Sequence, residues 1–224
     1  MTDDRPAAVL FDMDGTLVDS EKLWGIALGD YATYRGGELS EATRAAMVGS
    51  NMSTSMRMLL TDLGLGTSDA EVSAAADWVE ARSGELFRRG LPWRPGAQEV
   101  LTGVRALGVP TALVTSTIRS LAEIALDTLG RDSFDATVCG DEVGGRNKPD
   151  PEPYLRATRL LGADPARCIA VEDSPTGVAA AVAAGCTVLA VPCEVPLEPG
   201  ERRIVRESLE GLDVRALGSL LPGG

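Results

Sequence analysis

Short apolar runs rich in β-branched residues recur along the chain, and polar residues follow each of them. The runs are Ala7–Phe11, Thr111–Thr115, Phe134–Cys139, Cys168–Val171 and Thr187–Val191. Continuous apolar runs of this length are typical of parallel strands buried on both faces. Segments with helical periodicity lie between them, at Gln98–Leu107, Arg119–Leu129, Pro151–Leu161 and Thr176–Ala184, and we expect a last helix at Ser208–Leu220. The alternation predicts an α/β fold with a doubly wound parallel sheet.

One connection is much longer than the others, because the first and second predicted strands are separated by nearly a hundred residues. A single crossover helix needs far fewer. The segment Ser20–Arg89 contains no proline and is rich in Ala, Leu, Met and Glu, which favours helices. We therefore predict a helical cap at residues 19–91, inserted into a core formed by residues 1–18 and 92–224. Leu17–Ser20 and the Pro/Gly-rich Leu91–Gly96 would be the two hinge strands.

Composition narrows the chemistry that the chain can perform. A net charge of −12 disfavours binding to nucleic acid and to anionic membrane surfaces, and it also repels a phosphorylated substrate unless a local cation reverses the sign. The chain contains no histidine, which excludes Ser-His-Asp triads and histidine-containing zinc sites. No leader or membrane-spanning segment is evident in the pattern, so we expect a cytoplasmic protein.

Two pairs of carboxylates follow predicted strands. Asp12 and Asp14 come after the first strand, and Gly15 allows a sharp turn there. Two adjacent carboxylates need a cation or a proton, and oxygen ligands favour Mg²⁺. Asp173, beside Glu172 after a later strand, could complete a metal site with Asp12. A solvated Asp-Gly turn and an N-cap of the next helix explain the same residues without a metal.

Two further positions could bind phosphate. Thr115, Ser116 and Thr117 precede the helix that begins near Arg119. Hydroxyls and N–H groups at a helix N-terminus can bind a phosphate, but capping the helix is the better explanation for Ser116 and Thr117 taken singly. Lys148 is one of two lysines in a chain with nineteen arginines. Its ammonium could neutralise a phosphate next to Asp12, or it could be a solvated loop residue.

In this order, these residues resemble the four motifs of the haloacid dehalogenase superfamily of phosphotransferases. The matching segments are Asp12–Thr16, Thr115, Lys148 and Glu172–Asp173. The resemblance covers nearly the whole chain, and the helical insertion lies between the first and second motifs. It implies a Rossmann-like core with a helical cap domain.

The resemblance also implies a magnesium-dependent phosphatase. Asp12 would attack phosphorus to form an aspartyl phosphate, and Asp14 would protonate the leaving oxygen and then deprotonate water. Thr115 and Lys148 would bind the phosphoryl oxygens. The implied ligands of Mg²⁺ are Asp12, the backbone carbonyl of Asp14 and Asp173. Glu172 would either bind the ion directly or hold these ligands in place through hydrogen bonds. The substrate would also contact Gly15, Thr16 and Ser116.

Three functions remain open on the sequence. The β-phosphoglucomutase branch has a similar cap, and Val18–Glu21 and Val48–Ser50 resemble it. That branch carries a cap histidine where this chain has Trp24, and a phosphate-binding arginine where it has Met52. We therefore prefer hydrolysis of a small phosphorylated metabolite such as a sugar phosphate. A mutase remains possible if another cap arginine, namely Arg44, Arg57 or Arg82, holds a second phosphate. A non-catalytic relative is disfavoured because every motif residue is present.

The cap is expected to contact the leaving group and to set specificity. The candidate residues are Glu21, Trp24, Asn51, Met52 and Ser53. Trp24 and Met52 could instead pack the cap's own helices, and Glu21 could only stabilise the first turn of a helix. We expect a small-molecule phosphorylated substrate as the partner, neither nucleic acid nor a membrane, and a monomer.

Overall fold

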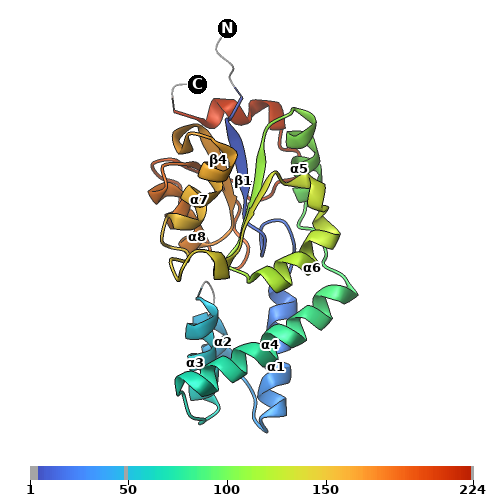
Figure 1. Cartoon of the computed structure of the whole chain (residues 1–224), viewed down its shortest axis with the longest axis vertical. Helices are drawn as coiled ribbons and strands as arrows, with labels where there is room; N and C mark the ends of the chain where they lie inside the picture. The colour runs from blue at the N-terminus through green and yellow to red at the C-terminus, as the bar shows by residue number, and fades with distance from the viewer. Residues whose placement is uncertain (1–4, 48–49, 223–224) are drawn as a thin grey trace. The chain divides into compact units, whose positions relative to one another are not determined.

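The computed structural model describes residues 5–47 and 50–222 (Figure 1). The chain divides into two compact units, one formed by Met1–Asp19 and Pro92–Gly224 and the other by Ser20–Leu91. We call the first the core unit and the second the cap unit. Val48 and Gly49, part of the segment compared with the mutases, lie outside the described residues.

The core unit contains a six-stranded parallel sheet, which confirms the predicted fold class. The strand order is β3-β2-β1-β4-β5-β6, so β1 lies in the middle, between β2 and β4. The strands are β1 (Ala8–Phe11), β2 (Thr111–Val114), β3 (Ala136–Val138), β4 (Cys168–Glu172), β5 (Thr187–Ala190) and β6 (Arg203–Val205). Every residue of β1, β2, β4 and β5 is buried, as the continuous apolar runs predict.

Helices cover both faces of this sheet. They are α5 (Ala97–Ala106), α6 (Arg119–Leu129), α7 (Glu152–Leu161) and α8 (Pro175–Ala183), with short 3₁₀ helices η1 (Arg131–Ser133), η2 (Gly140–Glu142) and η3 (Pro165–Arg167). Apolar side chains of α7 and α8 pack with those of the strands in one hydrophobic cluster. Figure 1 shows α5 and α6 on the opposite side of the sheet. In sheets with helices on both faces, ligands bind beyond the carboxyl ends of the strands, and here polar residues follow the carboxyl ends of the central strands.

Two features at the end of the chain differ from prediction. The predicted helix Ser208–Leu220 is wrong, because only η4 (Val214–Leu220) is helical and it is a 3₁₀ helix. The Ser208 hydroxyl accepts the backbone N–H of Glu210, and such local bonds compete with an α-helix. The edge strand β6 was not predicted, since its residues are exposed or only partly buried and lack a continuous apolar run.

The cap unit consists of helices, as predicted, and has its own hydrophobic core. Its helices are α1 (Glu21–Tyr34), α2 (Glu41–Met47), α3 (Met52–Asp62) and α4 (Asp69–Arg89). Buried side chains from all four, among them Tyr31, Leu59 and Val79, form one apolar cluster. Within the part of the chain that the structure describes, none of the helices combines the length and apolar character needed to cross a membrane.

Candidate active site

Asp12 lies directly after β1, at the centre of the sheet edge. Its backbone N–H donates to the carbonyl of Val171 in the neighbouring strand, at 3.0 Å, and its side chain is only 9% exposed. Oδ1 accepts a hydrogen bond from Lys148 Nζ at 2.6 Å. Oδ2 is buried and accepts no hydrogen bond from any of the described residues. Lys148 thus holds one oxygen of Asp12 in place. The other oxygen has no hydrogen-bond donor among the described residues and is available to a bound ligand.

Lys148 joins three elements at this point. Its ammonium donates to Asp12 Oδ1 and to Glu172 Oε1, both at 2.6 Å, and to the carbonyl of Val114 at the end of β2, at 2.9 Å. Burial opposes the charge of Lys148, but the two carboxylates outweigh burial and raise its pKa above the ordinary value. The three N–H groups of the ammonium all have acceptors, so a phosphoryl oxygen would have to replace one of them.

Glu172 is fully buried, and both of its oxygens accept hydrogen bonds. Oε1 accepts from Lys148 and from the Tyr154 hydroxyl at 2.7 Å. Oε2 accepts from the backbone N–H groups of Asp173 and Ser174 and from the Ser174 hydroxyl, at 3.1–3.2 Å. The carboxylate therefore fixes Lys148 and the loop between β4 and α8.

Asp14 is held by hydroxyl groups from the loop after β2. Its Oδ2 accepts from Thr115 Oγ1 at 3.2 Å and from Thr117 Oγ1 at 2.7 Å, while the backbone N–H of Thr117 donates to Thr115 Oγ1 at 3.0 Å. Ser116, between them in sequence, is exposed. The sequence favoured helix capping for Thr117, whereas the structure places its hydroxyl on Asp14.

The turn after β1 brings Asp173 close to the first motif. Gly15 has a φ of 80°, and a Cβ atom at this position would lie 2.2 Å from Asp173 Oδ2. The Thr16 hydroxyl donates to Asp173 Oδ1 at 3.3 Å. A side chain at position 15 would therefore displace this carboxylate, which explains why glycine stands there.

The residues at this edge fit a divalent cation. Asp12, Glu172 and Asp173 each offer an oxygen, and these oxygens lie within 4.8 Å of one another. Burial, together with the charges of Glu172 and Asp14 and despite Lys148, raises the pKa of Asp12 to about 7. A bound cation would satisfy the unpartnered oxygen of Asp12 and offset this excess of negative charge. Hard carboxylate ligands favour Mg²⁺ or a similar ion.

Three of the candidate cap residues, Trp24, Asn51 and Met52, have contacts within the cap unit. Trp24 meets Phe87 edge to face, with ring centroids 5.9 Å apart, and both Trp24 and Met52 pack against the cap's hydrophobic core. Asn51 Oδ1 accepts the backbone N–H of Thr54 and caps α3. The packing alternative raised from the sequence thus applies to Trp24 and Met52, and a substrate-binding role for all three residues stays a prediction.

Glu21 and Ser53 complete this set of cap candidates. Glu21, the first residue of α1, lies 3.8 Å from Arg44, whose Nη2 also donates to the Glu21 carbonyl at 3.3 Å. Ser53 is exposed in the first turn of α3. A substrate contact from either residue also remains a prediction.

Comparison with known proteins gives a consistent result. A family model described as haloacid dehalogenase-like hydrolase matches residues 6–185. The chain is 35% identical to hexitol phosphatase A of Escherichia coli (strain K12), with 94% of each chain covered. It is 33% identical to the phosphorylated carbohydrates phosphatase of Thermotoga maritima, with 80% of this chain and 81% of that protein covered. The solved structure of CbbY from Rhodobacter sphaeroides in complex with phosphate has a TM-score of 0.81 at 25% identity, covering 92% of this chain and 96% of that chain.

Proposed function

Because this chain belongs to the haloacid dehalogenase-like hydrolases, we propose that it is a magnesium-dependent phosphatase acting on phosphorylated sugars or sugar alcohols. The observation that carries the proposal is the state of Asp12. This buried carboxylate is oriented by Lys148 through one oxygen, and its other oxygen has no partner among the described residues. A buried carboxylate that is fixed in place and only partly satisfied is suited to nucleophilic attack beside a cation.

In the first step, a carboxylate oxygen of Asp12 attacks phosphorus and the bond to the sugar oxygen breaks. The leaving alkoxide takes a proton from Asp14, which must carry that proton when the substrate binds. In the second step, Asp14 takes a proton from water, and the water oxygen attacks phosphorus. The bond between Asp12 and phosphorus breaks, inorganic phosphate leaves, and the carboxylate of Asp12 is restored.

The remaining residues position these two carboxylates and neutralise charge. Lys148 and Thr115 would bind the phosphoryl oxygens, with Lys148 exchanging one of its present acceptors for the substrate. Asp12 and Asp173 would hold Mg²⁺, together with the backbone carbonyl of Asp14. When bound, the ion supplies positive charge against the phosphoryl oxygens. Glu172 would support these ligands rather than bind the ion itself, because both of its oxygens already accept hydrogen bonds from the protein.

A phosphomutase is the second candidate, and the cap offers little support for it. Such an enzyme needs a cap cation that can hold a second phosphate. The three candidate arginines each have carboxylate partners in the cap: Arg44 with Glu21, Arg57 with Asp69, and Arg82 with Asp30 and Glu85. Gripping a second phosphate would compete with these ion pairs, so the pairing favours a hydrolase.

The substrate class is inferred from the relatives. One is named for hexitol phosphates and another for phosphorylated carbohydrates. Both names describe phosphate esters of polyhydroxylated carbon chains. We infer that the substrate here is a phosphate monoester of this kind.

The experiment measures release of inorganic phosphate from a panel of hexose, pentose and hexitol phosphates, with Mg²⁺ and with EDTA. Wild-type protein should release phosphate only with Mg²⁺, and Asp12→Asn should reduce kcat at least ~10⁴-fold, because it removes the nucleophile. ³¹P NMR of the same mixtures distinguishes the alternatives. Isomerised sugar phosphate without inorganic phosphate would replace the hydrolase by the mutase.

A further inference from the structure

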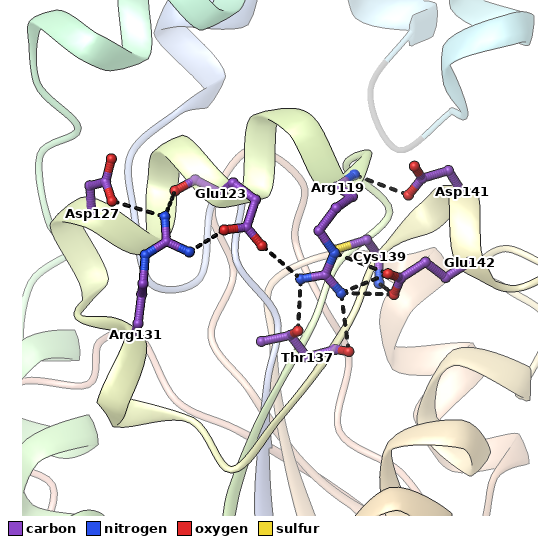
Figure 2. Close-up of polar contacts among 8 residues, drawn as sticks. All are labelled: Arg119, Glu123, Asp127, Arg131, Thr137, Cys139, Asp141 and Glu142. Atoms are coloured by element: carbon purple, nitrogen blue, oxygen red, sulfur yellow. Dashed lines mark hydrogen bonds and ion pairs between the residues drawn. The ribbon is translucent and has the colours of Figure 1, made fainter.

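A second polar network lies beside the site, on the loops that follow β2 and β3 (Figure 2). Its centre is Arg119, the first residue of α6. The Arg119 guanidinium donates to both oxygens of Glu142, with Nη2 at 2.8 and 2.9 Å and Nε at 3.0 Å from Oε1. It also donates to the Thr137 hydroxyl at 2.8 Å. The backbone N–H of Arg119 donates to Asp141 at 3.0 Å. The proposed mechanism uses none of these residues.

Two of the partners of Arg119, Asp141 and Glu142, belong to η2, the short helix that precedes the Lys148 loop. Glu142 Oε2 also accepts the backbone N–H of Cys139, at 2.9 Å, so the same carboxylate closes η2 and binds Arg119. The Glu142 carbonyl accepts from Arg156 of α7, at 2.8 Å. Glu142 therefore ties η2 to both α6 and α7.

The two loops make close contact at Gly140. The backbone N–H of Gly140 donates to the Thr117 carbonyl at 3.0 Å. A Cβ atom on Gly140 would lie 2.0 Å from the Ser116 carbonyl oxygen, so only glycine permits this approach. The Thr117 hydroxyl in turn donates to Asp14 at 2.7 Å. A continuous series of bonds thus runs from Arg119 and Glu142, through Gly140 and Thr117, to Asp14.

We propose that Arg119 and Glu142 are positioning residues for the acid–base step, since they clamp η2 against the Thr117 loop and so orient Asp14. The inference rests on the proposed function for its catalytic consequence. A bidentate arginine–carboxylate pair suits this purpose, because it fixes both distance and orientation. Arg119 and Glu142 have side chains 29% and 28% exposed, so solvent screens the pair less than a fully exposed one.

Arg131, the first residue of η1, supplies a matched control. Arg131 also forms ion pairs with carboxylates of α6, namely Glu123 and Asp127. Its partners among the described residues lie on α6, and Figure 2 shows it on the side of the network away from η2. Arg131 shares Glu123 with Arg119, so Arg131→Gln disturbs the α6 side of the network while leaving the contact between Gly140 and Thr117 in place.

The decisive measurement compares two esters that differ in their need for an acid. A sugar or hexitol phosphate loses a basic alkoxide, whereas p-nitrophenyl phosphate loses a stable phenolate that needs little protonation. In Arg119→Gln and Glu142→Gln, kcat/KM for the sugar ester should fall at least ~10-fold more than kcat/KM for p-nitrophenyl phosphate. The double variant should lose less than the two single losses combined, because both substitutions break the shared pair of Arg119 and Glu142. Arg131→Gln should leave the ratio of the two esters unchanged.

A readout without turnover tests the clamp itself. In Arg119→Gln, amide hydrogen exchange at Gly140 should accelerate at least ~10-fold, and in Arg131→Gln it should match the wild type. Equal losses on both esters, or unchanged exchange at Gly140, would overturn the inference. If the wild type released phosphate from no ester, the proposed function would fail, and hydrogen exchange would still decide whether the clamp exists.

Discussion

The two units of this protein hold their charged residues in different ways. In the core unit, Lys148 and Glu172 have side chains 5% and 0% exposed and are joined at 2.6 Å. In the cap unit, Arg57 and Asp69 are joined at 2.5 Å, but their side chains are 45% and 95% exposed. The distances are alike, while the surroundings differ completely.

This difference indicates where the chemistry is fixed. A buried ion pair that loses one partner leaves an uncompensated charge, which costs about 3–5 kcal/mol, whereas an exposed pair contributes about 0–1 kcal/mol. The buried core pair therefore resists rearrangement, and the exposed pair of Arg57 and Asp69 can change at little cost. We infer that the core determines the reaction and that the cap is free to determine the substrate.

The largest expected effect is in the core. Lys148→Gln removes the ammonium shared by Asp12, Glu172 and the Val114 carbonyl. We expect kcat for phosphate release to fall ~10³-fold, since the variant loses both the orientation of Asp12 and a charge facing the phosphoryl group. Steady-state kinetics at saturating Mg²⁺ measure this. The control is Lys22→Gln, the other lysine of the chain, which lies exposed in α1 and should keep kcat within about twofold. Equal losses in both variants would remove the distinction between core and cap.

A second prediction concerns Mg²⁺ and pH. In the metal-free protein the pKa of Asp12 is raised from 3.8 to about 7 by burial and by the neighbouring carboxylates. Protonated Asp12 therefore stabilises the metal-free fold at low pH, and this stabilisation is lost as the pH rises through about 7. Because Mg²⁺ must displace that proton, its apparent affinity should fall about 25-fold from pH 7.5 to pH 5.5. Isothermal titration calorimetry or the Mg²⁺-induced rise in Tm measures it.

The control for this titration is a carboxylate of the cap. Bonds from Ser40 lower the pKa of Asp62, which is exposed. Asp62→Asn should leave the pH dependence of Mg²⁺ binding as in the wild type, whereas Asp12→Asn should abolish it. An apparent Mg²⁺ affinity of the wild type that does not change between these pH values would contradict the raised pKa of Asp12.

More of the core than of the cap could be predicted from the sequence. Each strand-end residue follows an apolar run that is visible locally, and the parallel arrangement brings Asp12, Lys148 and Asp173 to one edge of the sheet. The sequence pointed to Thr117 only as a helix cap and did not point to Arg119, because their contacts with η2 join residues more than twenty positions apart. Arg119 is also one of nineteen arginines. Edge strand β6 and the last helix were missed or misjudged for a related reason, since neither is buried enough to leave a clear pattern.

A third prediction tests specificity in the cap. Trp24→Ala should lower kcat/KM for the best sugar phosphate about tenfold and change the order of preference within the panel, if Trp24 contacts the leaving group. Trp78→Ala is the matched control, since Trp78 also packs in the cap, stacked on Tyr34 with ring centroids 5.4 Å apart. It should lower Tm without changing the order of preference. Identical effects of the two variants would mean that Trp24 only packs the cap helices.

The smallest expected effect is at the exposed pair with which the comparison began. Arg57→Gln removes the bonds to Asp69 and to the Thr67 carbonyl. Because both charges of the ion pair lie largely in solvent, the free energy of unfolding should change by less than about 1 kcal/mol, and kcat/KM should stay within about twofold. Urea denaturation and the phosphate-release assay measure these quantities.

If Arg57 instead held a second phosphate, Arg57→Gln would abolish isomerisation of a sugar phosphate while leaving the fold intact. Loss of such an activity in ³¹P NMR would therefore give the cap a fixed role in the reaction and would favour the mutase.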